Sequence, residues 1–156
     1  MPLFETVTDY EPIRLMIQTE ITTDDNLRRY LEQQTRVHQR LLAEGRRYVA
    51  VVDCSMGTRI SPLQRKMYAE WLQENDEALR ATLEGAAFIM PSALVRGALT
   101  AIFWVARLHA PHTVHRQLDD GLRWALRLAR EKDLALSPKL RREGSKVFAL
   151  TPGRIA

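Results

Sequence analysis

The stretch YVAVVD, residues 48–53, decides the fold class of this chain. It is a continuous apolar run rich in β-branched valine, which is typical of a strand buried on both faces of a sheet. Such strands belong to parallel sheets that helices cover on both sides. A second run of this kind, GAAFIM at residues 85–90, ends at Pro91. Together the two runs predict the centre of an α/β sheet.

Helical patterns separate these strands. The expected helices, recognised by apolar residues at helical spacing and by capping side chains, are 23–45 (cap Thr23), 61–83 (cap Ser61), 92–107 (cap Ser92) and 122–132 (cap Asp119 or Asp120). Gly45, which can adopt a positive φ, ends the first of them.

Three further strands complete the expected sheet. Residues 3–8 and 13–21 are joined by the turn-like DYEP and should form an antiparallel hairpin. Residues 113–116 form a short strand before the last helix. The order β-β-α-β-α-β-α-β-α predicts an α/β fold with a mixed, mostly parallel five-stranded sheet and about four helices.

The length of 156 residues suits one domain. We expect that domain to cover residues 1–132. From Asp133 onward the sequence is basic and contains Pro and Gly, so residues 133–156 are expected to form an irregular C-terminal tail. Residues 147–150 are a candidate docking segment within it.

Charge is unevenly distributed along the chain. Residues 1–78 hold 10 basic and 13 acidic residues, and residues 79–156 hold 13 and 6. A basic last helix and tail on an ordinary surface explain this, and a patch for nucleic acid or anionic lipid is the alternative. Nucleic acid is the less favoured partner, because no zinc-finger spacing, RNP motif or basic zipper occurs.

The expected compartment is the cytoplasm. The N-terminal MPLFETVTDYEPIR has neither a basic region nor an apolar run that would indicate a secretory signal. The most apolar stretch, residues 97–106, would span only about 15 Å as a helix, so no transmembrane segment is expected. Cys54 is the sole cysteine, which fits a reducing environment.

Four segments carry a resemblance to a known family: YVAVVD (48–53), the helix start at Ser61, AAFIMPSALVRGALTAI (86–102) and VHRQLDDGLRWAL (114–126). Over about residues 3–132 the chain resembles the STAS domains of bacterial anti-sigma-factor antagonists, particularly the STAS/CRAL-TRIO-like subgroup. The resemblance implies a non-catalytic signalling domain that acts by protein–protein association. It also makes Ser61 the phospho-acceptor candidate, although the family's Asp-Ser-Ser-Gly is absent and Pro62 follows Ser61.

The loop after the buried strand is the expected recognition surface, because open α/β sheets bind ligands beyond the carboxyl ends of their strands. Its candidate residues are Asp53, Ser55, Thr58, Arg59 and Ser61. For Ser61 the alternative role is that of a helix cap. Cys54 is better explained as a small buried hydrophobe than as a nucleophile, since no His lies near it in the sequence.

The helix at residues 93–106 is apolar around much of its circumference, more than packing on a sheet requires. Its candidate association residues are Leu99, Ile102, Phe103 and Trp104. The second apolar face could meet the tail, a homodimer or regulatory partner, or an apolar ligand such as a lipid, and ordinary burial between helices is the remaining alternative.

No enzyme, metal or cofactor is expected. His109, His112 and His115 are close in sequence but not at converging positions, so surface roles explain them better. The pairs Asp24–Asp25 and Asp119–Asp120 stand at helix starts, where carboxylates are favoured. No phosphate-loop, dinucleotide, hydrolase or zincin motif occurs.

Overall fold

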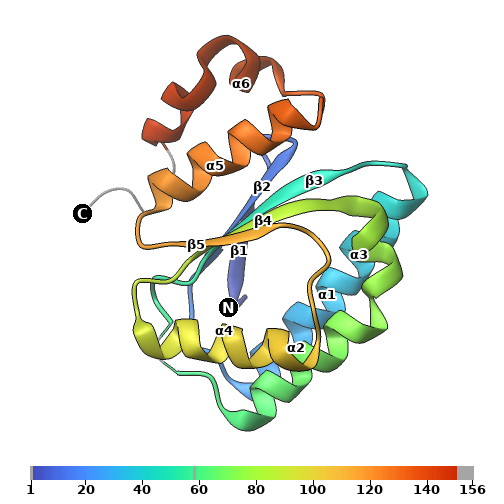
Figure 1. Ribbon diagram of the computed structural model, residues 1–156, viewed down its shortest axis with the longest axis vertical. Coiled ribbons are helices and arrows are strands. Elements are labelled where there is room, and N and C mark those ends of the chain that lie inside the picture. Colours follow the sequence, from blue (N-terminus) through green and yellow to red (C-terminus); the bar gives the residue numbers. More distant parts are fainter. Residues whose placement is uncertain (1, 58, 151–156) are drawn as a thin grey trace.

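The computed structural model describes residues 2–57 and 59–150, which form a single sheet covered by helices (Figure 1). The strands are β1 (Phe4–Val7), β2 (Ile13–Gln18), β3 (Tyr48–Asp53), β4 (Leu83–Ile89) and β5 (His112–His115). The helices are α1 (Asp24–Ala43), α2 (Pro62–Glu74), α3 (Asp76–Thr82), α4 (Ala93–Val105), α5 (Leu118–Glu131) and α6 (Pro138–Glu143), followed by the 3₁₀-helix η1 (Gly144–Leu150).

The sheet has the strand order β1-β2-β3-β4-β5. β1 pairs with β2 in antiparallel orientation, and every later pair is parallel. The α/β class and the mixed, mostly parallel five-stranded sheet are therefore confirmed, with β3 at the centre as its continuous apolar run predicts.

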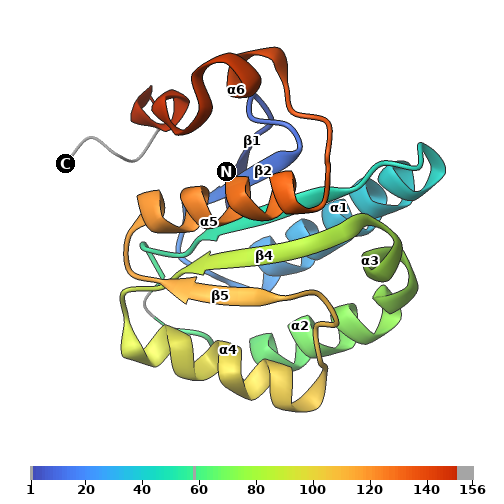
Figure 2. The same cartoon turned by 45° about the horizontal axis from the view of Figure 1, so that its top comes forward.

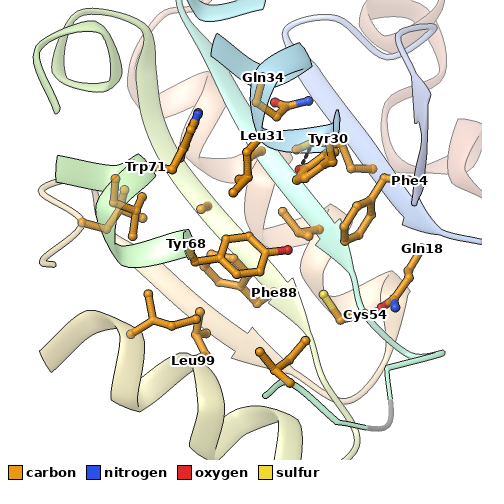
Figure 3. Close-up of a pocket in the computed structure, with 18 of the residues that line it drawn as sticks. Phe4, Gln18, Tyr30, Leu31, Gln34, Cys54, Tyr68, Trp71, Phe88 and Leu99 are labelled. Carbon is orange, nitrogen blue, oxygen red and sulfur yellow. Dashed lines mark hydrogen bonds between the residues drawn. The ribbon is translucent and has the colours of Figure 1, made fainter. Parts of the chain in front are cut away.

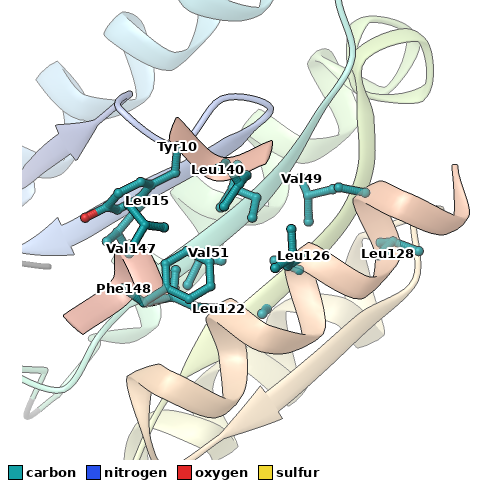
Figure 4. Packing of buried hydrophobic residues seen from close by; sticks show 14 of the residues in the cluster. Tyr10, Leu15, Val49, Val51, Leu122, Leu126, Leu128, Leu140, Val147 and Phe148 are labelled. Carbon is teal, nitrogen blue, oxygen red and sulfur yellow. The ribbon is translucent and has the colours of Figure 1, made fainter. Parts of the chain in front are cut away.

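Two layers of helices cover the two faces of the sheet (Figure 2). α1 to α4 lie on one face, and α5, α6 and η1 lie on the other. Successive side chains of β3 point to opposite faces of the sheet. Val49 and Val51 pack in the cluster with α5, whereas Tyr48 and Ala50 pack in the cluster with α1 and α3. Figure 4 shows the side of α5.

The end of the chain differs from the expected irregular tail. Residues 138–150 are helical, and the side chains of Leu140, Val147 and Phe148 are fully buried against the sheet beside α5. The ring of Phe148 packs edge-on against Tyr10 at a centroid distance of 5.5 Å (Figure 4). The expectation of irregular structure is therefore wrong over these residues, because apolar residues at 140, 147 and 148 meet a face that α5 leaves open. Residues 151–156 of the expected tail lie outside the described residues.

The number of helices also exceeds the expected four. The single helix expected at 61–83 is divided at Asn75, and Leu83 belongs to β4. α5 begins at Leu118, and its N-terminal cap is Gln117 without a side-chain hydrogen bond. The prediction that Asp119 or Asp120 caps this helix is wrong; both lie in its first turn, where the helix dipole favours carboxylates.

Within the described part of the chain, no helix combines the length and the apolar character that crossing a bilayer requires.

Candidate functional site

An apolar cavity lies between the sheet and the layer formed by α1, α2 and α4 (Figure 3). Its volume is about 160 Å³. Side chains from the strands, from each of these helices and from the loop after β3 line it. They include Phe4, Met16, Tyr30, Leu31, Ala50, Cys54, Tyr68, Trp71, Ala86, Phe88, Val95, Leu99 and Phe103.

Small residues in the strands make this space. Ala50 of β3 and Ala86 of β4 are register partners, and both line the cavity. Two neighbouring alanines leave space above the sheet that larger side chains would fill as far as the helices. The helices do not move closer to the sheet there, because the large side chains of Tyr68 and Trp71 of α2 lie between α2 and the sheet.

The carboxyl edge of the sheet forms one end of the cavity. Thr22, Gly57 and Ile60 line it there, in the loops that follow β2 and β3. Gly57 fits closely, since a Cβ atom at this position would lie 3.0 Å from the carbonyl oxygen of Cys54 and 3.5 Å from Cγ2 of Val95. The loop after β3 is thus in contact with α4.

The polar atoms at this end are satisfied internally. Nε2 of Gln18 donates to the carbonyl oxygen of Glu20 at 2.9 Å and to Oγ1 of Thr22 at 3.4 Å. The cavity wall therefore offers a ligand few polar groups that are not already bonded to the protein.

The titratable groups in the cavity are held neutral. Burial, with a smaller contribution from the nearby Asp53 charge, raises the pKa of the Cys54 thiol to about 12. Burial also raises the pKa of Tyr30 and of Tyr68, whose hydroxyl points into the cavity (Figure 3). At neutral pH the cavity therefore presents a thiol and phenols rather than a thiolate or phenolates.

A buried histidine closes the opposite end. Nδ1 of His38 lies 2.7 Å from the carbonyl oxygen of Gln34, which can only accept, so Nδ1 carries the proton. Nε2 then accepts from the hydroxyl of Tyr48 at 2.6 Å. Burial lowers the pKa of His38 below its usual 6.5, and the ring is neutral at neutral pH.

The expected recognition loop is partly structural. Oδ1 of Asp53 accepts from the backbone N–H and the hydroxyl of Ser55, and Asp53 is buried. Oγ of Ser61 accepts from the backbone N–H of Gln64 at 3.1 Å, which makes Ser61 the cap of α2. Arg59 is exposed, and Thr58 lies outside the described residues. The phospho-acceptor role of Ser61 stays a prediction.

The candidate association residues of α4 point in different directions. Leu99, Ile102 and Phe103 line the cavity, and the Phe103 ring packs against Phe88 at a centroid distance of 5.9 Å. Trp104 is 86% exposed and faces away from the sheet. Three of the four candidates therefore belong to the cavity and one to the outer surface.

The histidines near β5 have separate surroundings. The His112 ring lies tilted against the Phe103 ring at a centroid distance of 4.7 Å, and Nε2 of His115 shares a hydrogen bond of 2.8 Å with Oγ1 of Thr113. Among the residues that the structure describes, no group of three or more His, Cys, Asp or Glu side chains is placed to hold a metal ion.

Sequence reasoning missed most of the cavity lining. Tyr30, Trp71 and Leu72 lie within the expected helices, and Ala50 and Ala86 within the expected buried strands, and neither pattern by itself indicates a cavity. The sequence does show alanines in both expected central strands and aromatic residues in the expected helices, but the pairing of Ala50 with Ala86 arises only in the folded sheet.

Comparison of the chain with protein-family models finds no match, and neither does comparison with curated proteins.

Proposed function

We propose that the protein is a non-catalytic binding domain that holds a small apolar molecule in the cavity between the sheet and α1, α2 and α4. The cavity itself is the observation that carries this proposal. An apolar cavity of roughly 150 Å³ in a protein interior takes up a molecule the size of benzene. The ligand is therefore a ring or a length of acyl chain.

The state of the titratable groups supports binding over catalysis. A nucleophile or general base needs a pKa near the working pH. Burial instead raises the pKa values of Cys54, Tyr30 and Tyr68 and lowers that of His38. All four shifts lead away from neutral pH and favour the neutral forms. Neutral groups suit an apolar ligand, because no charge has to be desolvated when it enters.

A matched pair of substitutions at Cys54 tests the proposal. Cys54→Phe fills the cavity, whereas Cys54→Ala keeps it open. Titration with the fluorescent fatty acid cis-parinaric acid should give saturable binding to the natural chain and to Cys54→Ala. Binding to Cys54→Phe should be weaker by about tenfold or more, since several buried methylenes at roughly 0.8 kcal/mol each are lost.

Thermal melts of both variants show whether they keep the fold. Equal affinity of a folded Cys54→Phe, or no saturable binding of the probe to the natural chain together with no lipid in native mass spectra, would show that the cavity is not a ligand site.

A regulatory protein that docks on the loop after β3 is the second candidate, which the resemblance to STAS domains supports. The favouring observation is that Met56 is 47% exposed between exposed Ser55 and Arg59. Binding of such a partner should weaken in Arg59→Ala and in Ser61→Glu. If both variants hold the partner as well as the natural chain, this surface is not the docking site.

A further inference from the structure

The outer face of α4 is apolar and has no partner within the described structure. Leu94 is 64% exposed, Trp104 is 86% exposed and Val105 is 67% exposed. Between them the helix presents only small or weakly polar residues, Gly97, Thr100 and Ala101. Exposed apolar residues grouped in this way mark a contact surface more often than a free one.

The same helix is a wall of the cavity. Val95, Ala98 and Ile102, on its inner face, are buried and line the cavity. The outer apolar face and the cavity are therefore separated by the thickness of this one helix. The neighbouring helix α2 packs on the same inner side, where Ala69, Tyr68 and Leu72 meet Ile102 and Phe103.

An arginine stands near each end of this face, and at the Arg107 end Asp76 of α3 lies close to Val105 and Arg107 but is paired with Arg80 at 2.8 Å. Residues 85–118 contain Arg96, Arg107 and Arg116 but no Asp or Glu. The ion pairs in which both partners are described lie between Glu11 and Glu84, so these arginines have no carboxylate partner among the described residues. Arg96 is fixed at the start of α4 by hydrogen bonds to the carbonyl oxygens of Met90 and Pro91, at 3.0 and 2.9 Å.

Charge decides which occupant fits. A second copy packed by α4 on α4 would bring arginines close together, because Arg96 and Arg107 stand near both ends of the helix whether the pair is parallel or antiparallel. An anionic lipid surface has the opposite sign. Its interface also suits tryptophan, whose ring is apolar and whose N–H stays hydrated, and arginine, whose stem is apolar.

We propose that α4 docks on an anionic membrane surface through Leu94, Trp104 and Val105, with Arg96 and Arg107 beside the lipid headgroups, and that the cavity exchanges its apolar ligand there. The exchange step rests on the proposed function, whereas the docking does not depend on the cavity.

The test uses the full chain and two kinds of vesicle. The double variant Leu94→Ser/Trp104→Ser removes the apolar contact at exposed positions. Leu42→Ser on α1, where Leu42 is 45% exposed, is the matched control. The natural chain and Leu42→Ser should cosediment with mixed phosphatidylcholine–phosphatidylglycerol vesicles, and the double variant should partition at least about tenfold more weakly.

A charge variant separates the two contributions. Arg107→Gln should weaken binding to the mixed vesicles and leave the weaker binding to pure phosphatidylcholine vesicles unchanged, since only the former are anionic. Added salt should reduce the difference between the two vesicle types.

Three results would overturn the docking. The first is no cosedimentation of the natural chain with mixed vesicles, and the second is equal cosedimentation of the double variant. The third is a stable dimer in size-exclusion chromatography that the double variant dissociates, which would make a second copy the occupant. Cys54→Phe distinguishes failure of the proposed function, because a chain with a filled cavity should still bind vesicles while losing cis-parinaric acid.

Discussion

At the residue scale, His38 is a neutral histidine held between two fixed partners. The Nδ1–H of His38 donates to the carbonyl oxygen of Gln34, and the hydroxyl of Tyr48 donates to Nε2. The ring also packs edge-on against Trp71 at a centroid distance of 5.6 Å. A proton added to Nε2 would compete with the Tyr48 hydrogen bond and would place a charge in a buried layer.

This arrangement makes stability depend on pH. The pKa of His38 is lowered in the folded state, so the unfolded chain takes up the proton first as the pH falls through 6.5. The stabilisation is therefore complete above that pH and is lost below it. Urea unfolding at about pH 7.5 and about pH 5 measures how much free energy of unfolding is lost between the two pH values. This loss should be smaller for His38→Gln than for the natural chain.

Glutamine is the matched substitution because its amide can donate and accept without titrating. If His38→Gln and the natural chain lose the same free energy of unfolding between the two pH values, then the buried histidine does not contribute to the acid sensitivity.

At the element scale, the start of α2 is fixed by a reciprocal pair of hydrogen bonds. Ser61 Oγ accepts from the N–H of Gln64, and Oε1 of Gln64 accepts from the N–H of Ser61 at 3.0 Å. Nε2 of Gln64 also donates to Oδ1 of Asp24, so the first turns of α1 and α2 are joined. The loop after β3 is thus anchored at the edge of the cavity.

Removing this cap should destabilise the fold by a predictable amount. Ser61→Ala loses the acceptor for the Gln64 N–H and should cost about 1 kcal/mol in the free energy of unfolding. Ser61→Asp restores an acceptor beside the positive end of the helix dipole and should stay close to the natural chain. Chemical denaturation measures both, and an equal loss in the two variants would contradict the capping role.

Local signals explain which elements the sequence could predict. The valine run of β3 and the caps Thr23 and Ser61 depend on residues close together in the chain, and the structure has them where they were expected. The break at Asn75 has no Pro or Gly to mark it. The cavity depends on the pairing of Ala50 with Ala86, residues whose contact only the folded sheet creates.

At the scale of the whole molecule, the two faces of the sheet are closed in different ways. The face toward α1, α2 and α4 keeps an apolar cavity, whereas the face toward α5 is packed with side chains from α5, α6 and η1. Gly121 of α5 fits this close packing, because a Cβ atom there would lie 2.4 Å from Cδ1 of Ile89. The side of α5 is therefore closely packed, whereas the opposite side has room for a ligand.

The segment after α5 should be part of the folding unit rather than an appendage. Truncation after Lys132 removes Leu140, Val147 and Phe148, all fully buried, and uncovers Leu15 and Val51 on the sheet. Each large apolar side chain contributes roughly 1.5–3 kcal/mol when buried, so the truncated chain should melt at a clearly lower temperature and associate through the uncovered face. Phe148→Ala in the full chain should cost about 3–5 kcal/mol by itself. Calorimetry and size-exclusion chromatography measure both effects. Unchanged melting and elution of the truncated chain would show that residues 1–132 fold independently and that α6 and η1 rest on a sheet face already stable without them.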